Sequence, residues 1–235
     1  MQLGVNVDHV ATLRNLRDTS YPSVIEVAKS AIAHGADFIT VHIREDRRHI
    51  RDKDLLELKE GITAPINLEM AAIDEMVLLA KQMSPESVCI VPEKREERTT
   101  EAGIDAIVMF ATLLPVVSEL KSRGIKTTLF IDPQQAQIEY AKKLAVDKIE
   151  LHVGQYCMHQ QQPMLEEIKE AARYAAKLGM EVHAGHGIDY TTAKTLATVP
   201  EISALNIGHF IICEAVTHGI AYVVEKMKKI ITTQD

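Results

Sequence analysis

The sequence predicts a (β/α)8 TIM barrel, an α/β fold in which eight parallel strands alternate with helices. Apolar strand-like segments and amphipathic helical segments follow one another along all 235 residues. The strand-like segments recur on average about every 29 residues, the size of one βα unit. The length is also close to the ~250 residues typical of this barrel. An open doubly wound sheet is the competing fold, but no Gly-rich dinucleotide fingerprint follows any predicted strand.

The predicted strands are short and rich in aliphatic residues, and most end in polar ones. In the second strand, Ile39, Val41 and Ile43 alternate with residues that face the other side. The eight predicted strands are Leu3–Val10, Asp37–Arg44, Ala64–Met70, Ser87–Glu93, Lys126–Asp132, Lys148–Gly154, Glu181–Gly187 and Ala204–Phe210.

Helical periodicity fills most of the connections between these strands. The predicted helices are Ser23–His34, Asp52–Gly61, Ile73–Met83, Ile104–Lys121, Gln134–Leu144, Met164–Leu178, Tyr190–Ala197 and a single long helix, Ile212–Thr232. Ile104–Lys121 is apolar on all sides, which favours packing against another subunit. The charged connection Pro92–Gly103 is long enough to predict a lid or binding loop. The polar stretch 155–163 gives no clear structure.

The composition predicts one globular domain, residues 1–235, in the cytoplasm. Hydrophobic residues make up 46% and charged residues 25%. The net charge of −7 gives no basic field for nucleic acid or an anionic membrane, so neither is expected as a partner. Cys89, Cys157 and Cys213 are scattered, as expected for small core residues in a reducing compartment. The N-terminal residues do not resemble a signal peptide, and no apolar run is long enough to span a bilayer.

Polar pairs at the ends of the predicted strands indicate an active site. The interior of such a barrel is normally filled by branched apolar side chains, and its active site lies at the carboxyl ends of the strands. Residues two apart on a strand share a face, so repeated polar pairs at one rim are costly unless they form a site. The pairs are Asn6/Asp8, His42/Arg44, Asn67/Glu69 and Glu150/His152.

The chemistry of these side chains suggests acid–base catalysis. Glu69, partly desolvated near the rim, suits a general base with a raised pKa. His42 and His186 suit proton acceptor and donor, because imidazole titrates near neutral pH.

Two anion sites are also predicted. Gly187 and Gly208 follow strands seven and eight, where such barrels bind phosphate through backbone N–H groups. Arg44 and His49 are suited to hold a second anion. Two anion sites beside acid–base groups suggest joining or rearranging phosphorylated small molecules.

No catalytic metal is expected from the ligand spacing. Asp8 and His9 are adjacent and therefore point to opposite faces of a strand, unlike an H-x-H pair. Glu150 with His152 is plausible on geometry, but Asn and Arg neighbours dilute the cluster.

Six motifs, in register across nearly the whole chain, resemble those of the pyridoxine 5′-phosphate synthase family. They are GVNVDHVATLRN (Gly4–Asn15), TVHIREDRRHI (Thr40–Ile50), NLEM (Asn67–Met70), VPEKR (Val91–Arg95), AGHG (Ala184–Gly187) and LNIGH (Leu205–His209). The resemblance implies a TIM-barrel enzyme without metal or organic cofactor that assembles as a homo-octamer. Its implied reaction joins 3-amino-2-oxopropyl phosphate to 1-deoxy-D-xylulose 5-phosphate, giving pyridoxine 5′-phosphate, phosphate and water.

The resemblance also implies roles for individual residues. His42 and Glu69 match the family's proton acceptors, His186 its proton donor, and Glu150 a carboxylate that stabilises a transition state. Matches to substrate-contacting positions are Asn6 and Arg17 for the aminoketone phosphate, Asp8, His9, Arg44, His49 and Thr99 for the deoxyxylulose phosphate, and Gly187, Gly208 and His209 for the backbone site.

Two other functions remain open at this point. A sugar-phosphate isomerase or epimerase on the same barrel explains Glu69 and one phosphate site, but leaves Arg44 and His49 without a ligand. A non-catalytic barrel that senses a phosphorylated ligand would explain the anion sites, but it would give the acid–base groups no role.

Overall fold

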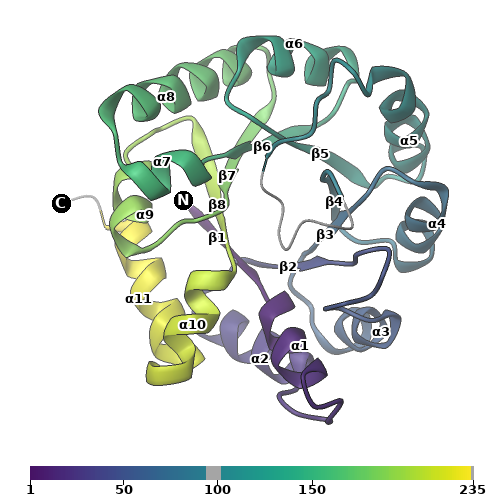
Figure 1. Cartoon of the computed structure of the whole chain (residues 1–235), viewed down its shortest axis with the longest axis vertical. Coiled ribbons are helices and arrows are strands. Elements are labelled where there is room, and N and C mark those ends of the chain that lie inside the picture. Colours follow the sequence, from purple (N-terminus) through teal and green to yellow (C-terminus); the bar gives the residue numbers. More distant parts are fainter. Residues whose placement is uncertain (94–101, 234–235) are drawn as a thin grey trace.

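Eight parallel strands close into one barrel, which confirms the predicted fold class. The computed structural model describes residues 1–93 and 102–233. Each strand pairs with the next, and β1 pairs with β8 to close the ring (Figure 1). The strands are β1 Gln2–Asn6, β2 Phe38–His42, β3 Ile66–Met70, β4 Ser87–Ile90, β5 Lys126–Ile131, β6 Lys148–His152, β7 Glu181–Gly185 and β8 Ile202–Ile207.

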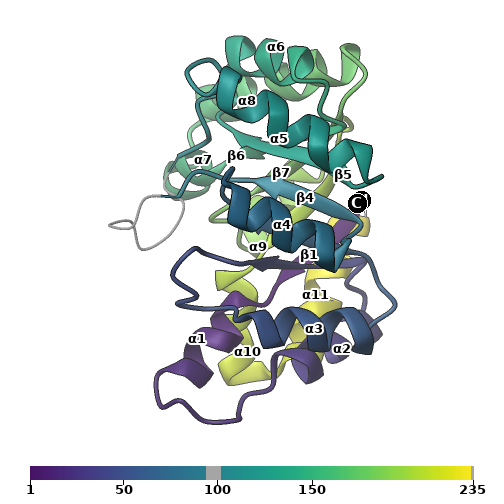
Figure 2. The same cartoon turned by 90° about the vertical axis from the view of Figure 1, so that its right-hand side faces the viewer.

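Helices surround the barrel on all sides (Figure 1). They are α1 Asp8–Asn15, α2 Val24–Ala33, α3 Asp52–Gly61, α4 Asp74–Met83, α5 Phe110–Ser122, α6 Gln135–Lys143, α7 Gly154–His159, α8 Gln162–Lys177, α9 Tyr190–Leu196, α10 His209–His218 and α11 Ile220–Thr232. In the side view, α1 and α7, which directly follow β1 and β6, lie toward the same end of the barrel (Figure 2). No helix within 1–93 and 102–233 combines the length and apolarity that a bilayer crossing requires.

Three of the predicted strands run on into a helix, because the chain turns into that helix immediately after the barrel wall. The predicted strand Leu3–Val10 ends at Asn6, and α1 begins at Asp8 after a turn at Val7 (φ −106°, ψ 11°). In the same way, Lys148–Gly154 ends at His152 before α7, and Ala204–Phe210 ends at Ile207 before α10. The polar stretch 155–163 forms α7 and the start of α8.

The predicted long C-terminal helix is wrong in one respect: it is two helices that meet at Gly219. Gly219 has φ +80° and ψ 144°, a conformation that glycine adopts without a Cβ clash. The break lets α10 contact α1 while α11 packs against α2 and α9. The helix predicted from Ile104 also begins later, at Phe110, because Asp105 Oδ1 accepts the backbone N–H groups of Ile107 and Val108 in a local turn.

The strands carry two different faces, as the alternation predicts. Their aliphatic side chains, such as Ile39, Val41 and Leu68, are fully buried beneath the helices. Thr40, on the opposite face of β2, is also fully buried. Inside the barrel, its hydroxyl donates a hydrogen bond to Asn206 Oδ1 of β8. The apolar shell therefore supplies most of the stability, and the barrel interior is free to carry polar chemistry.

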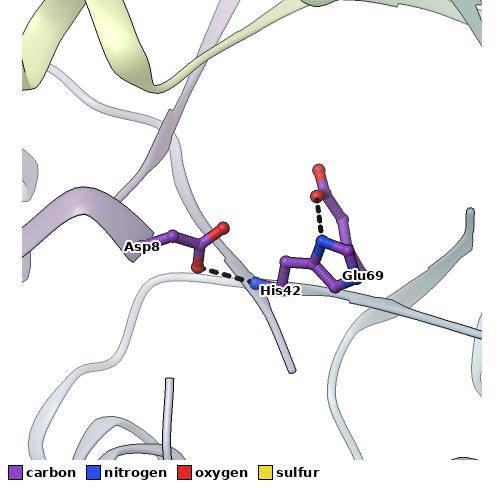
Figure 3. Close-up of side chains that lie close together, drawn as sticks. All are labelled: Asp8, His42 and Glu69. Carbon is purple, nitrogen blue, oxygen red and sulfur yellow. Dashed lines mark hydrogen bonds and ion pairs between the residues drawn. The ribbon is translucent and has the colours of Figure 1, made fainter. Parts of the chain in front are cut away.

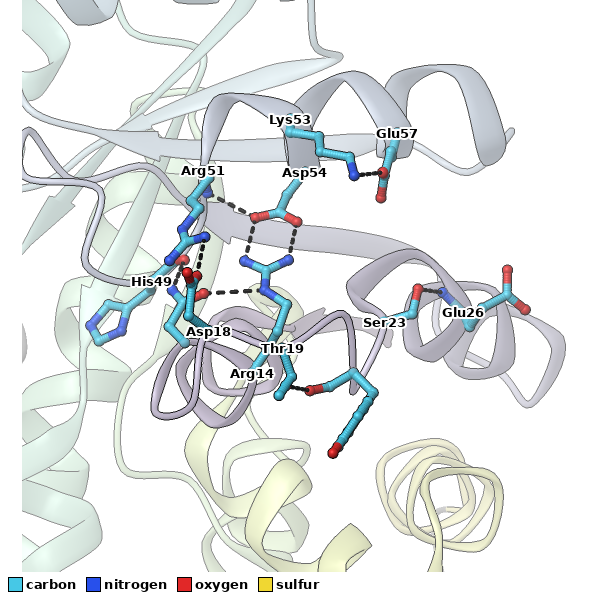
Figure 4. A network of polar contacts seen from close by, with 12 residues as sticks. Arg14, Asp18, Thr19, Ser23, Glu26, His49, Arg51, Lys53, Asp54 and Glu57 are labelled. Atoms are coloured by element: carbon cyan, nitrogen blue, oxygen red, sulfur yellow. Dashed lines mark hydrogen bonds and ion pairs between the residues drawn. The ribbon is translucent and has the colours of Figure 1, made fainter.

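An ion pair between Arg14 and Asp54 joins α1 to α3 (Figure 4). Arg14 binds Asp54 with two parallel hydrogen bonds, and the second joins Nη2 to Oδ2 at 2.9 Å. Asp54 Oδ2 also accepts the N–H of Arg51 at 2.8 Å. Asn15 Nδ2, at the end of α1, donates to the His49 carbonyl at 2.7 Å. These contacts place the connection after β2 against α1.

Truncating the aliphatic shell is expected to destabilise the whole barrel. Leu68 is fully buried between β3 and the helices, so Leu68→Ala should lower the free energy of unfolding by about 2–5 kcal/mol. Leu56 on α3 is 60% exposed, and Leu56→Ala should change it by no more than about 0.5 kcal/mol. Urea titration followed by circular dichroism measures both; equal losses would contradict this account of the core.

Candidate active site

A cavity of about 640 Å³ opens at the carboxyl ends of the strands. Twelve of the fourteen predicted site residues line it: Asn6, Asp8, His9, His42, Arg44, His49, Glu69, Glu150, His186, Gly187, Gly208 and His209. Arg17 is exposed in the turn after α1 and does not line the cavity. Thr99 and most of the predicted lid lie outside the described residues. Strand ends far apart in sequence therefore converge as the polar pairs predict.

Asp8 links the ends of β1 and β2. Its Oδ2 accepts from Asn6 Nδ2 at 2.8 Å, and its Oδ1 accepts the backbone N–H of His42 at 2.8 Å. Burial raises the pKa of the Asp8 carboxyl, although the neighbouring charge and hydrogen bonds of His42 and Asn6 oppose that shift. Asp8 thereby fixes the backbone position from which the His42 ring enters the cavity (Figure 3).

The His42 ring lies between two carboxyl groups. Its Nδ1 is 3.8 Å from Glu69 Oε2 (Figure 3), and its Nε2 is 2.8 Å from Glu93 Oε1. Both His42 and Glu93 are almost completely buried. Glu93 is a site residue that the sequence did not single out, because it stands in a charged run after β4 where nothing distinguishes it from its neighbours.

Asn206 joins the two buried carboxyl groups of the cavity. Its Nδ2 donates to Glu69 Oε1 and to Glu150 Oε2, both at 3.2 Å. Burial, together with the charges of Glu150 and Asp8, raises the pKa of Glu69 well above its usual range. Burial likewise raises the pKa of Glu150 to about 7, against the hydrogen bond from Asn206. Two neighbouring carboxyl groups with raised pKa values can exchange protons near neutral pH.

A chain of hydrogen bonds inside the barrel orients the Asn206 amide. Ser87 Oγ donates to Asn67 Oδ1 at 2.8 Å, Asn67 Nδ2 donates to Thr40 Oγ1 at 3.4 Å, and Thr40 Oγ1 donates to Asn206 Oδ1 at 2.8 Å. Because Oδ1 is occupied by the hydroxyl, Nδ2 faces Glu69 and Glu150. The motif LNIGH (Leu205–His209) contains Asn206, so the sequence carried a signal for this residue.

His186 approaches the cavity from the end of β7. Its backbone has φ +78°, a conformation that residues other than glycine rarely adopt. Its ring lies 5.1 Å from that of His152, whose Nδ1 is 3.0 Å from Asp132 Oδ1. A Cβ at Gly154 would lie 2.7 Å from His186 Cδ2, so the glycine makes room for the ring. Burial, with His152 and His209 nearby, lowers the pKa of His186 to about 4.

The imidazoles of His9, His49 and His209 form a cluster in the lining of the cavity, which Arg44 also lines. The His9 ring lies 4.8 Å from that of His209 and 6.4 Å from that of His49. Burial and the neighbouring His209 lower the pKa of His9, and burial lowers that of His49 to about 4. Within the described residues, buried His9 Nδ1 makes no hydrogen bond. An anion placed here would favour the protonated rings and receive charged hydrogen bonds from them.

The N-terminus of α10 borders the same region. Gly208 precedes the helix, and a Cβ at this position would lie 3.0 Å from Asn6 Cβ. Its absence keeps β1 and β8 close and leaves the first N–H groups of α10 accessible to an anion. Gly187 also lines the cavity, with φ +76°. The structure thus brings the two predicted glycines to one side of the acid–base groups.

One group within the described residues has the spacing of a metal site. Donor atoms of Asp8, His42 and Glu69 lie within 4.8 Å of one another. Both Asp8 oxygens already accept hydrogen bonds, and Glu69 Oε1 accepts one from Asn206 Nδ2, so few carboxylate lone pairs are left for a cation. The donor set therefore fits a metal poorly, and the absence of a catalytic metal stays a prediction.

Comparison with known proteins decides the family. The model of the family described as "Pyridoxal phosphate biosynthesis protein PdxJ" matches residues 3–233. The chain belongs to the PdxJ family. Among its relatives in that family, a protein of Anaplasma marginale named pyridoxine 5′-phosphate synthase is 61% identical over 234 residues, covering 100% of this chain and 98% of the relative. An Ehrlichia ruminantium protein of the same name is 59% identical over 230 residues, covering 98% and 97%.

Solved structures of other proteins share the PdxJ chain's fold. The 3-hexulose-6-phosphate synthase of Salmonella typhimurium superposes with a TM-score of 0.72 at 13% identity, covering 98% of each chain. The 3-keto-L-gulonate-6-phosphate decarboxylase of Vibrio cholerae gives a TM-score of 0.68 at 10% identity, covering 98% of this chain and 96% of the other. At such low identity, these likenesses extend to the barrel alone.

The raised pKa of Glu150 predicts a stability difference that depends on pH. Between its usual 4.5 and about 7, the folded protein keeps a proton that the unfolded chain has released, so wild-type stability falls as pH rises. Glu150→Gln removes this contribution while leaving an oxygen for Asn206. As pH rises through that window, the free energy of unfolding of the variant should therefore increase relative to that of wild type, by up to about 3 kcal/mol. Urea unfolding of both proteins at several pH values measures this difference. Two curves of unfolding free energy against pH that run parallel would refute the raised pKa of Glu150.

Proposed function

We propose that this member of the PdxJ family is a pyridoxine 5′-phosphate synthase. It condenses 3-amino-2-oxopropyl phosphate with 1-deoxy-D-xylulose 5-phosphate and releases pyridoxine 5′-phosphate, phosphate and water. Full-length relatives bearing that name support the assignment. The observation that carries it is one cavity lined by Glu69, His42 and His186 together with Arg44, three further imidazoles and the start of α10.

The reaction requires a series of proton transfers and no redox step. The amine and the ketone form an imine; proton removal then drives phosphate loss, and ring closure with dehydration completes the aromatic ring. We assign Glu69 and His42 as proton acceptors and His186 as proton donor, with Glu150 stabilising a transition state. Their burial and proximity support these roles, because desolvated acid–base groups held at one site exchange protons efficiently.

The two phosphorylated substrates bind on different sides of these groups in our proposal. The deoxyxylulose phosphate is held by Arg44, His49, Asp8, His9 and Thr99, and the aminoketone phosphate is contacted by Asn6 and Arg17. Gly187, Gly208 and His209 supply the backbone site at the α10 N-terminus. The gathered imidazoles and the N-terminus of α10, where His209 stands, support anion binding along this part of the cavity.

The remaining parts of the proposal concern the protein's setting. We propose that it works in the cytoplasm without metal or organic cofactor, and that it assembles as a homo-octamer. Exposed apolar side chains before and on α5, Val108 (79% exposed) and Leu114 (46% exposed), support burial in an assembly.

Mixing the two substrates with purified protein and a chelator tests the function directly. The aromatic product should appear by its absorbance only when both substrates are present, and chelation should not slow it. Turnover of a single phosphorylated sugar by itself would instead indicate an isomerase or epimerase.

Removing the Glu69 carboxylate should abolish chemistry while preserving binding. Glu69→Gln keeps the shape and an oxygen for Asn206 but cannot take a proton, so kcat should fall by ~10²–10⁴. Substrate affinity, measured by calorimetry, should stay within about threefold because the anion-binding groups are unchanged. Glu60→Gln, on the exposed face of α3, is the matched control. Near-normal turnover of Glu69→Gln would remove Glu69 from the mechanism.

A further inference from the structure

We propose that Glu93 is a positioning residue that holds His42 with Nε2 protonated and with the Nδ1 lone pair facing Glu69 and the cavity. The significance of this arrangement for turnover rests on the proposed function, in which His42 accepts a proton. The hydrogen bond itself is a property of the resting protein and can be measured without substrates.

The contacts of Glu93 identify it as the partner of His42. Its Oε1 lies 2.8 Å from His42 Nε2, and its Oε2 accepts the backbone N–H of Glu45 at 3.2 Å. The side chain is 5% exposed and that of His42 is 7% exposed. A buried carboxylate with both oxygens engaged is held in one orientation, so it can hold the ring in turn.

The ionisation of Glu93 sets the direction of the hydrogen bond. Burial alone would raise the pKa of the Glu93 carboxyl, but the hydrogen bond and charge of His42, with the Glu45 N–H and Arg44, lower it overall. An ionised carboxylate only accepts hydrogen bonds, so His42 Nε2 must carry the proton. In the neutral ring, Nδ1 then has the lone pair.

That lone pair faces the reacting side of the site. Nδ1 is 3.8 Å from Glu69 Oε2, and His42 lines the cavity, as Glu69 does. Glu93 does not line it, which separates a positioning role from substrate contact. When Nδ1 takes a proton from substrate, the Nε2–H bond is kept and the carboxylate stabilises the imidazolium that forms.

Backbone hydrogen bonds of the barrel lie close to both partners. Asp8 Oδ1 binds the His42 backbone N–H at 2.8 Å. The N–H of Val91 donates to the Met70 carbonyl at 3.0 Å, which continues the β3–β4 pairing to within two residues of Glu93. Strand pairing therefore brings the chain segments that carry the two side chains close together.

Nitrogen-15 NMR of histidine-labelled protein without substrates tests the hydrogen bond. At alkaline pH, the wild-type His42 ring should show a protonated Nε2 and an unprotonated Nδ1, with a downfield, slowly exchanging Nε2–H. In Glu93→Ala that resonance should be lost. The matched control is Glu45→Gln, which removes one exposed charge nearby but keeps the Glu45 backbone N–H; its spectrum should equal that of wild type.

Steady-state kinetics on the same proteins tests the consequence. Glu93→Ala should lower kcat by ~10² with KM within about threefold, because the lost function is that of a general base and not of a binding group. Glu93→Gln, which offers an uncharged oxygen to Nε2, should recover part of kcat. Melting temperatures of all variants identify any that fail to fold, and Glu45→Gln should keep wild-type kcat.

The outcomes separate this inference from the proposed function. A wild-type His42 protonated at Nδ1, or a Glu93→Ala variant that keeps wild-type kcat, overturns the positioning role. Absence of product from folded wild-type protein overturns the proposed function, yet leaves the Nε2–H resonance as a valid measurement of the Glu93–His42 bond.

Discussion

The hydrogen bonds from Asn206 to Glu69 and Glu150 are the constraint on which the rest of the site depends. Two carboxyl groups buried beside each other are stable only when protons and donors offset their desolvation. The amide supplies the donors, and a hydrogen-bonded chain from Ser87 across the barrel keeps it in the required orientation. A polar layer that would destabilise an ordinary barrel core is thus satisfied by hydrogen bonds at one rim.

The outer half of the site depends on the start of α1. The Asn6–Asp8 contacts end β1 and turn the chain into the helix that carries His9. The same helix carries Arg14 and Asn15, which bind Asp54 and the carbonyl of His49. His9 and His49 are therefore placed by contacts between α1 and the β2–α3 connection, and Glu69 and Glu150 are placed by strand pairing.

Burial shifts the pKa values of the carboxyl groups and of the imidazoles in opposite directions. It raises the pKa values of Glu69 and Glu150 and lowers those of His49 and His186, because in each case it disfavours the charged form. These carboxyl groups and imidazoles therefore favour their uncharged forms. An anion placed beside the imidazoles would favour their protonated forms.

The sequence by itself determined the barrel, the order of its strands and most of the residues at its rim, because strand periodicity and paired polar residues are local properties of the chain. It did not determine where strands give way to helices, as at Asn6–Asp8 and Gly219, since those boundaries depend on packing between α1, α10 and α11. Nor did it single out Glu93 or the bridging role of Asn206. Both act through side chains 51 to 166 residues distant in sequence, and only barrel closure brings those partners within hydrogen-bonding distance.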